Sequence, residues 1–262
     1  MSSSVLYRQT SSGIANIHLN RPQVRNAFDA SMINELISAF KQASESDEIK
    51  LVLLTSEGNH FSAGADIQWM KSMASMTEQD NIADAAQLAL LMATIYQCPK
   101  PTIAKVQGPA FGGAVGMVAC CDIVVASDQS RFCFSEVKLG LIPAVISPYV
   151  VKAIGSRSAH KLFLTAEIFD ARQAAALGLV HSVVSAEALE GAVQSTLKSV
   201  LANGPSAMAR AKQLVRTVDA HAITDDIIQY TVNAIASIRV SEEGQEGLRA
   251  FLQKRSPAWQ EH

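Results

Sequence analysis

The sequence predicts an α/β fold, in which parallel strands are joined by helical crossovers, with a helical region after it. Short apolar runs typical of buried strands alternate with helix-like segments over the first half of the chain. From about residue 147 the pattern is mainly helical. The chain has 262 residues, which is long enough to bury a large core without cross-links. We expect an α/β core over residues 1–195 and a helical region over residues 196–262.

The elements of the predicted core follow one another in strict alternation. The predicted strands cover residues 14–19, 51–55, 102–107 and 123–126. Asp29 and Thr77 precede helical patterns, and each can cap a helix N-terminus. The helix after Thr77 ends at Pro99, because proline cannot continue a helix. A helix near Ile67 and one that begins within residues 108–116 complete the alternation.

The second half of the chain has clear helix boundaries. Gly178 ends one helix and Pro205 begins another, since glycine is frequent just after a helix and proline in its first turn. Two further helical patterns cover residues 224–240 and 243–254. These helices form the predicted C-terminal region.

Composition excludes several classes of protein. Hydrophobic residues make up 48% of the chain and charged residues 18%, as in ordinary globular proteins. The formal net charge is −2, whereas proteins that bind nucleic acid through its phosphates are normally basic, so we expect no nucleic-acid partner. The longest apolar stretch, residues 108–121, is too short and glycine-rich to cross a membrane.

The cysteines and histidines show no ligand spacing. Cys98, Cys120, Cys121 and Cys133 contain no CxxC pair, so neither a disulfide framework nor a zinc site is predicted. Reduced, buried thiols are typical of a cytoplasmic protein. Residues 1–10 lack the apolar core of a secretion signal, which favours the same compartment.

Two small-residue segments are candidates for a site. HFSAGAD (60–66) and GPAFGGAVGMVACCD (108–122) each follow a predicted strand and lead into a helix. Such turns leave backbone N–H groups unpaired, and two of them facing one cavity can stabilise a developing oxyanion. The alternative for each segment is tight backbone packing, which also requires glycine.

A third segment, residues 132–148, places Glu136 among apolar neighbours. A carboxyl group in an apolar setting has a raised pKa and can act as acid and base near neutral pH. The alternative is a surface glutamate that pairs with Lys138.

Together these segments resemble the crotonase family, the enoyl-CoA hydratases and isomerases. The matching motifs are LNRPQVRNAF (19–28), FSAGADI (61–67), KPTIAKVQGPAFGGAVGMVACCDIVVAS (100–127) and FSEVKLGLIPA (134–144). Residues 164–180 and 246–257 also fit, so the resemblance covers nearly the whole chain. It implies a spiral of ββα repeats, assembly into trimers or hexamers, and an acyl-CoA thioester as substrate, with no further cofactor.

The resemblance also implies roles for particular residues. Glu136 is the implied acid–base group, and the N–H groups of Ala65 and Gly113 form the implied oxyanion hole. The implied substrate contacts are Val24, Arg25, Ala63, Asp66, Ile67 and Gly112, with Phe251 and Lys254 reaching the coenzyme from the C-terminal region, sometimes of a neighbouring subunit. Gln68 stands where some members have a phosphate-binding lysine.

One position departs from the well-known hydratases of the family, which use two glutamates. Gly116 occupies the first glutamate position, so only Glu136 remains, and we expect room for a water molecule at Gly116. Enzymes with this single glutamate include 3,2-enoyl-CoA isomerases and some hydratases. The motifs resemble most the methylglutaconyl-CoA hydratases of leucine breakdown, and also the isohexenylglutaconyl-CoA hydratases.

Three functions are therefore weighed. Hydration of an enoyl-CoA is favoured, with double-bond isomerisation as the alternative reaction. RNA binding, a property of one relative in this group, needs a basic helix face, whereas the helix over residues 29–48 carries mainly acidic side chains. A catalytically inactive subunit is disfavoured because Glu136 and both small-residue segments are present.

Lys105 is a charged residue within a predicted strand, just before the glycine-rich turn. One interpretation is an ion pair inside the protein or at a subunit interface. The other is that Lys105 lies near the acyl pocket and binds a substrate with a distal carboxylate.

Overall fold

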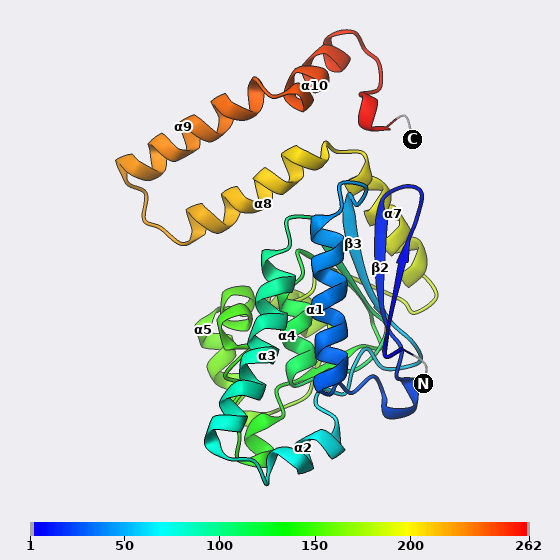
Figure 1. Cartoon of the computed structure of the whole chain (residues 1–262), viewed down its shortest axis with the longest axis vertical. Coiled ribbons are helices and arrows are strands. Elements are labelled where there is room, and N and C mark those ends of the chain that lie inside the picture. The colour runs from blue at the N-terminus through cyan, green and yellow to red at the C-terminus, as the bar shows by residue number, and fades with distance from the viewer. Residues whose placement is uncertain (1–2, 261–262) are drawn as a thin grey trace.

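A computed structural model describes residues 3–260 of the chain (Figure 1). Residues 1–2 of the predicted core and residues 261–262 of the predicted C-terminal region lie outside the described part. The main sheet has six strands in the order β1-β2-β3-β4-β6-β9. Their bounds are β1 (Val5–Gln9), β2 (Ile14–Leu19), β3 (Leu51–Ser56), β4 (Thr102–Val106), β6 (Ile123–Ser127) and β9 (Ser182–Val184). All pairings are parallel except that of β1 with β2.

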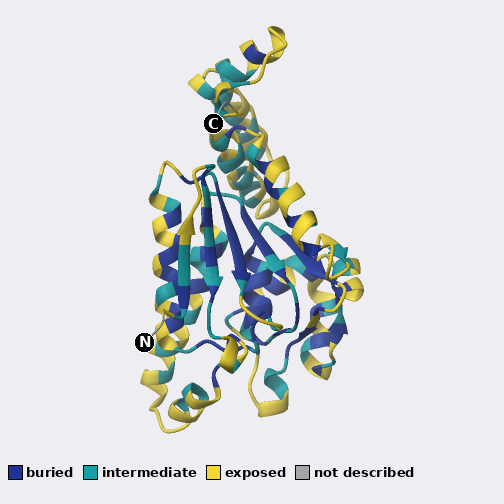
Figure 2. Ribbon diagram, turned by 90° about the vertical axis from the view of Figure 1, so that its right-hand side faces the viewer, coloured by how far each residue is buried: buried dark blue, intermediate teal, exposed yellow. Residues whose placement is uncertain are grey.

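Helices cover both faces of this sheet. One face packs against α1 (Ala30–Glu45), α3 (Glu78–Gln97), α4 (Gly113–Cys120) and α5 (Ser147–Thr165), and the other against α7 (Leu189–Leu201) (Figure 1). Alternate residues of the strands belong to two separate cores, one on each face of the sheet. Val52, Leu54 and Ala104 are in the first core, and Leu53 and Ile103 are in the second. The central strands β3, β4 and β6 are therefore buried on both faces (Figure 2), as in parallel sheets generally.

The predicted helix caps are confirmed. Asp29 accepts a hydrogen bond from the backbone N–H of Met32 at the start of α1. Thr77 forms a capping box with Asp80 at the start of α3. The four strands predicted from apolar runs are also present, within one or two residues of their predicted ends.

A second, smaller sheet was not predicted. It consists of β5 (Ala110–Phe111), β7 (Arg131–Cys133) and β8 (Phe169–Asp170). Strands of two or three residues show no period-2 pattern, so the sequence alone cannot reveal them. This sheet places the segment after β5 beside the segment after β7, which is how two of the candidate site segments meet.

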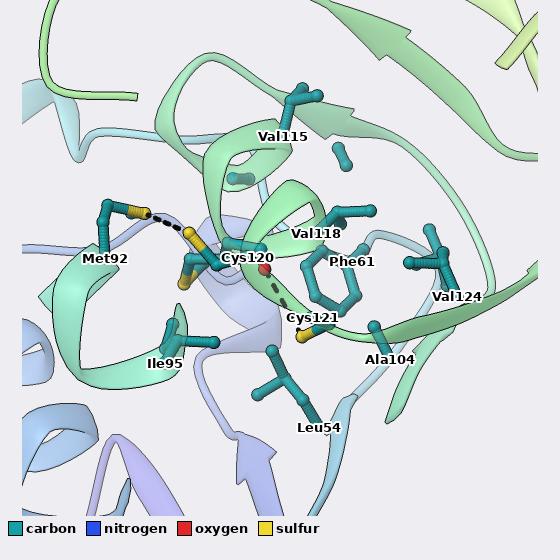
Figure 3. Packing of buried hydrophobic residues seen from close by; sticks show 14 of the residues in the cluster. Leu54, Phe61, Met92, Ile95, Ala104, Val115, Val118, Cys120, Cys121 and Val124 are labelled. Carbon is teal, nitrogen blue, oxygen red and sulfur yellow. Dashed lines mark hydrogen bonds between the residues drawn. The ribbon is translucent and has the colours of Figure 1, made fainter. Parts of the chain in front are cut away.

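The first core contains three of the four cysteines, Cys98, Cys120 and Cys121. Cys98, Cys120, Cys121 and Cys133 are free and buried, as predicted. In Figure 3 the Cys120 thiol faces the sulfur of Met92, 3.8 Å away, among the aliphatic side chains of the core. Burial raises the pKa of the Cys121 thiol to about 12, so this group is an inert core residue.

The C-terminal helices extend away from the sheet (Figure 1). They are α8 (Pro205–Asp219), α9 (Asp225–Arg239) and α10 (Glu242–Leu252). Neither α8 nor α9 contains a buried residue, and in α10 only Ala250 is buried. The predicted boundary between residues 195 and 196 falls inside α7, which packs on the sheet. Within residues 3–260, no helix has the length and apolar character needed to cross a bilayer.

The remaining elements are short connectors. They are the helices α2 (Ile67–Met73) and α6 (Ala171–Ala176) and the 3-10 helices η1 (Pro22–Val24), η2 (Glu136–Leu139) and η3 (Ala258–Gln260). The α2 and η2 segments begin at candidate site residues, Ile67 and Glu136.

Candidate active site

Glu136 begins η2, directly after the small sheet, and its side chain turns toward the N-terminus of α4. A Cβ atom placed on Gly112 would lie 3.3 Å from the Glu136 Oε1 atom, so the carboxyl group sits against the backbone of the glycine turn. The Oε2 atom is buried and has no hydrogen-bond partner among the described residues. Loss of contact with water raises the pKa of this carboxyl above its ordinary value, and a backbone hydrogen bond opposes that rise only in part.

The alternative interpretation of Glu136 does not match this environment. No ion pair joins it to Lys138 in the described part of the chain, and its carboxyl group is buried. A buried carboxyl oxygen without a hydrogen-bond partner costs free energy, and such groups are typical of functional sites.

The two small-residue segments lie against each other. Ser62 pairs with Ala110 in a short parallel bridge, and the Phe111 N–H donates to the Ser62 carbonyl at 3.0 Å. A Cβ atom on Gly64 would lie 2.7 Å from the Phe111 carbonyl oxygen, and Gly64 has φ +88°. Only glycine allows this approach of the two backbones. The contact brings Ala65 to the same region as Gly112 and Gly113.

Two backbone donors in this region are unused. The flanking bonds run from Phe28 N–H to the Gly64 carbonyl (2.8 Å) and from Asp66 N–H to the Phe28 carbonyl (2.9 Å), which leaves the N–H of Ala65 free. Gly113 is the first residue of α4, where N–H groups have no partner within the helix. Neither N–H donates a hydrogen bond to any of residues 3–260. Two such donors beside one buried carboxyl group can polarise a carbonyl oxygen and move a proton next to it.

Close packing and free amides occur together at Gly113. A Cβ atom there would lie 2.7 Å from the Phe28 ring, so a larger residue would displace that ring. The two interpretations of the glycine-rich segment are therefore compatible, because the packing that requires glycine also holds the amide in place.

The expected room for water at Gly116 does not exist. A Cβ atom on Gly116 would lie 2.2 Å from Ile146 Cγ2 and 3.3 Å from the Met92 sulfur. Ile146 is 2% exposed and fills the space above this turn of α4. This contact could not be predicted from the sequence, because Gly116 and Ile146 are far apart along the chain and no local pattern indicates that they pack together.

The predicted coenzyme contacts lie at the η1 and α2 segments. The Ala63 N–H donates to the Arg25 carbonyl at 2.9 Å, which joins the two segments. A cavity of about 470 Å³ lies beside them and is lined by Val24 and Asp66, together with Gln68 and Trp69.

Arg21 holds this region together and was not singled out from the sequence. Its guanidinium group pairs with Asp29 and with Asp66, both at 3.0 Å. The Asp66 carboxylate also caps α2 by accepting a hydrogen bond from the Gln68 N–H. Both of its oxygens therefore have partners within the protein. Ile67, by contrast, is 65% exposed beside this cap and free to meet a ligand.

The structure does not bring Lys105 to the other site residues. Its ammonium group pairs with Glu190 of α7 at 2.5 Å. Lys105 is in register with Val125, which belongs to the core under α7, whereas α4 packs on the opposite face of the sheet. Within this chain Lys105 therefore forms an ion pair, and it does not approach Glu136.

Phe251 and Lys254 are also remote from Glu136 within this chain. They lie at the end of α10, beyond α8 and α9 (Figure 1), and Phe251 is 81% exposed. Any contact they make with a ligand at this site would have to involve a second subunit.

The described residues contain no cluster of three or more side chains that could hold a metal ion. The chemistry available at the site is that of one carboxyl group and two backbone amides.

Comparisons with known proteins show the family of the chain. A family model of enoyl-CoA hydratase/isomerase matches residues 9–262. The crystal structure of an enoyl-CoA hydratase from Shewanella pealeana is 45% identical, with a TM-score of 0.94 over 98% of this chain and 96% of that one. A crotonase-type structure from Legionella pneumophila is 47% identical, with a TM-score of 0.93 over 98% and 99%.

A Thermus thermophilus relative of the enoyl-CoA hydratase group is 34% identical over 247 residues, which are 93% of this chain and 96% of the relative. The chain therefore belongs to the enoyl-CoA hydratase/isomerase family. Its fold is the crotonase fold, an α/β core followed by C-terminal helices, as predicted.

Proposed function

We propose that the chain is an enoyl-CoA hydratase that adds water across the α,β double bond of 3-methylglutaconyl-CoA, a step of leucine breakdown. The observation that supports hydration is the lone buried carboxyl group of Glu136 beside two unused backbone amides. The support for this particular substrate is the resemblance of the motifs around Gly116 and Glu136 to the methylglutaconyl-CoA hydratases.

In the proposed mechanism, the thioester carbonyl accepts hydrogen bonds from the N–H groups of Ala65 and Gly113. This polarisation makes the β-carbon electrophilic and stabilises the enolate that forms. Ionised Glu136 takes a proton from water as the oxygen bonds to the β-carbon. The same carboxyl group then returns a proton to the α-carbon, so that one group serves as base and acid.

Coenzyme A enters as part of the substrate, and the proposed reaction needs no other cofactor. Val24, Arg25 and Ala63 are the proposed contacts of its adenine and pantetheine, next to the cavity of about 470 Å³. Ile67 and Gly112 border the thioester in this proposal.

We also propose that residues 196–262 mediate assembly into a trimer or a pair of trimers. Exposed apolar side chains on α9 and α10 support this proposal, because such surfaces are typical of protein interfaces. Phe251 and Lys254 would then reach the coenzyme of a neighbouring subunit. The buried free cysteines fit the reducing conditions of the cytoplasm.

A panel of enoyl-CoA thioesters, with and without a distal carboxylate, tests the reaction and the substrate class together. Loss of the conjugated-enoyl absorbance should be fastest with 3-methylglutaconyl-CoA. A higher kcat/KM for plain enoyl-CoAs would overturn the proposed substrate. A higher kcat/KM for isohexenylglutaconyl-CoA would show that the enzyme is an isohexenylglutaconyl-CoA hydratase instead.

Water labelled with ¹⁸O separates hydration from isomerisation. A hydratase incorporates the label at the β-carbon, whereas a 3,2-enoyl-CoA isomerase moves the double bond without adding oxygen. Product without the label would show that the enzyme catalyses isomerisation and not hydration.

A further inference from the structure

Two glycines stand at the start of α4, and a side chain lies over each. Gly112 precedes the first residue of α4 and has φ +54°, and Gly116 lies one turn into the helix. The Glu136 carboxyl group lies over Gly112, and Ile146 lies over Gly116. The two side chains therefore cover the N-cap and the first turn of α4.

Ile146 closes the space next to the carboxyl group. Its Cβ and Cγ2 atoms would lie only 2.7 and 2.2 Å from a Cβ atom on Gly116, and Met92 bounds the space on another side. Ile146 stands at the turn into α5, and its side chain is 2% exposed. A water molecule needs both volume and polar partners, and this position offers hydrocarbon and sulfur.

We propose that Ile146 is a positioning residue for the reaction. It seals the helix face beside Glu136, so that neither water nor a second acid–base side chain can stand over Gly116. The reacting carbons then meet a single carboxyl group, with no water held over Gly116. This inference rests on the proposed function for its catalytic consequence, but its effect on Glu136 can be measured without substrate.

The electrostatic surroundings support an effect of Ile146 on the carboxyl group. Burial is the main cause of the raised pKa of Glu136. The nearby titratable groups are the Cys133 thiol of β7, whose pKa Glu136 helps to raise, and Lys138 of η2. The glycines at the start of α4 and the side chain of Ile146 contribute no charge. In this proposal, hydrocarbon at position 146 adds to the desolvation of Glu136.

Ile146→Thr and Ile146→Val form a matched pair, because threonine and valine have nearly the same shape and differ by one hydroxyl group. The Glu136 carboxyl group can be titrated in the ligand-free protein by infrared difference spectroscopy, with its band assigned by its loss in Glu136→Gln. We expect the titration to move to lower pH in Ile146→Thr relative to Ile146→Val, because a polar group stabilises the ionised carboxylate. The same titration in both variants would overturn the proposal.

A third variant, Ile146→Ala, tests the sealing role without adding a hydroxyl group. Water admitted over Gly116 should move the titration in the same direction, whereas an unchanged titration in a folded protein would contradict the proposal. The acidic limb of the pH profile of kcat/KM should move with it. A protein whose Glu136 titration responds as expected, but which hydrates no enoyl-CoA, would retain the Ile146 inference and refute the proposed function.

Discussion

Glu136 combines an energetic cost with the chemistry proposed for the site. Its Oε2 atom is buried without a partner, which destabilises the ionised form of the carboxyl group. A base whose pKa is raised toward neutral pH can also return the proton that it has accepted. The same physical cause, desolvation, therefore accounts for the energetic cost and for the proposed chemistry.

Glu136→Gln should lower kcat at least about a hundredfold, because general acid–base catalysis is worth roughly 10²–10⁴. The amide is nearly the same size as the carboxyl group, so binding of a saturated acyl-CoA, measured by calorimetry, should persist. Lys138→Gln, two residues away on η2, is the matched control and should stay close to wild type. Near-normal turnover of Glu136→Gln would remove the proposed role.

The same variant should change the pH dependence of stability. The pKa of Glu136 is raised in the folded state, so its contribution to stability is fully present below its ordinary pKa of 4.5 and is lost as pH rises through the folded-state value. Glu136→Gln does not titrate. We therefore expect its urea midpoint to exceed that of wild type at neutral pH, and the difference to shrink below pH 4.5. A difference independent of pH would contradict desolvation as the cause.

Gly113 can be tested as a hydrogen-bond donor only if its packing is relieved first, because any Cβ atom there meets Phe28 at 2.7 Å. In a Phe28→Leu background, Gly113→Ala keeps the backbone N–H and Gly113→Pro removes it. We expect the proline variant to be about 10²–10³ slower in kcat than the alanine variant. Equal turnover of the two variants would show that this N–H does not act on the substrate.

At the scale of single elements, α8 is attached to the end of the sheet by a largely buried ion pair. Lys212 donates to Asp122 at 2.5 Å and to the Lys100 carbonyl at 3.1 Å. Asp122 also accepts from the N–H and hydroxyl of Thr102, at 2.7 and 2.9 Å. The Lys212 side chain is 8% exposed and that of Asp122 is 31% exposed, so loss of Lys212 would leave a half-buried carboxylate without its cation.

Lys212→Met should lower the free energy of unfolding by about 2–3 kcal/mol, somewhat less than for a fully buried pair because Asp122 keeps its bonds to Thr102. Lys161→Met is the control, since Lys161 pairs with Glu167 at an exposed site and should cost less than about 1 kcal/mol. Chemical denaturation of both variants gives the comparison. Similar losses in the two variants would mean that burial does not decide the strength of the α8 attachment.

At the scale of the whole molecule, α9 presents an apolar stripe that this chain does not cover. Ile228, Val232 and Ile235 follow helical spacing and are about half exposed, at 51%, 51% and 48%. The described part of the chain offers these side chains no buried environment. A stripe of this kind on a projecting helix indicates an interface with another molecule.

We expect light scattering to give a multiple of three times the chain mass of 28.0 kDa at micromolar concentration. Val232→Glu should move the mass toward that of a single chain, because it buries a charge in the apolar interface. Asn233→Glu adds the same charge at the adjacent polar position and should leave the assembly intact. A stable wild-type monomer would refute the trimer.

Local sequence signals determined a large part of this protein. Apolar runs marked the four central strands, Asp29 and Thr77 marked helix starts, and Glu136 stood out as a carboxylate among apolar residues. These features could be predicted because periodicity, caps and turns depend on residues that are close in sequence. The two small-residue segments were recognisable for the same reason.

Only the tertiary structure decided the contacts between distant residues. It showed that Ile146 fills the space over Gly116, that Lys105 pairs with Glu190 on the far face of the sheet, and that short strands join the segments of the site. A side chain's partner across the core leaves no periodic signal in the sequence, because it depends on how whole elements pack. The residue types of the site, including its single glutamate, could therefore be predicted from the sequence, whereas the filled space over Gly116 and the burial of the Glu136 Oε2 atom depend on packing.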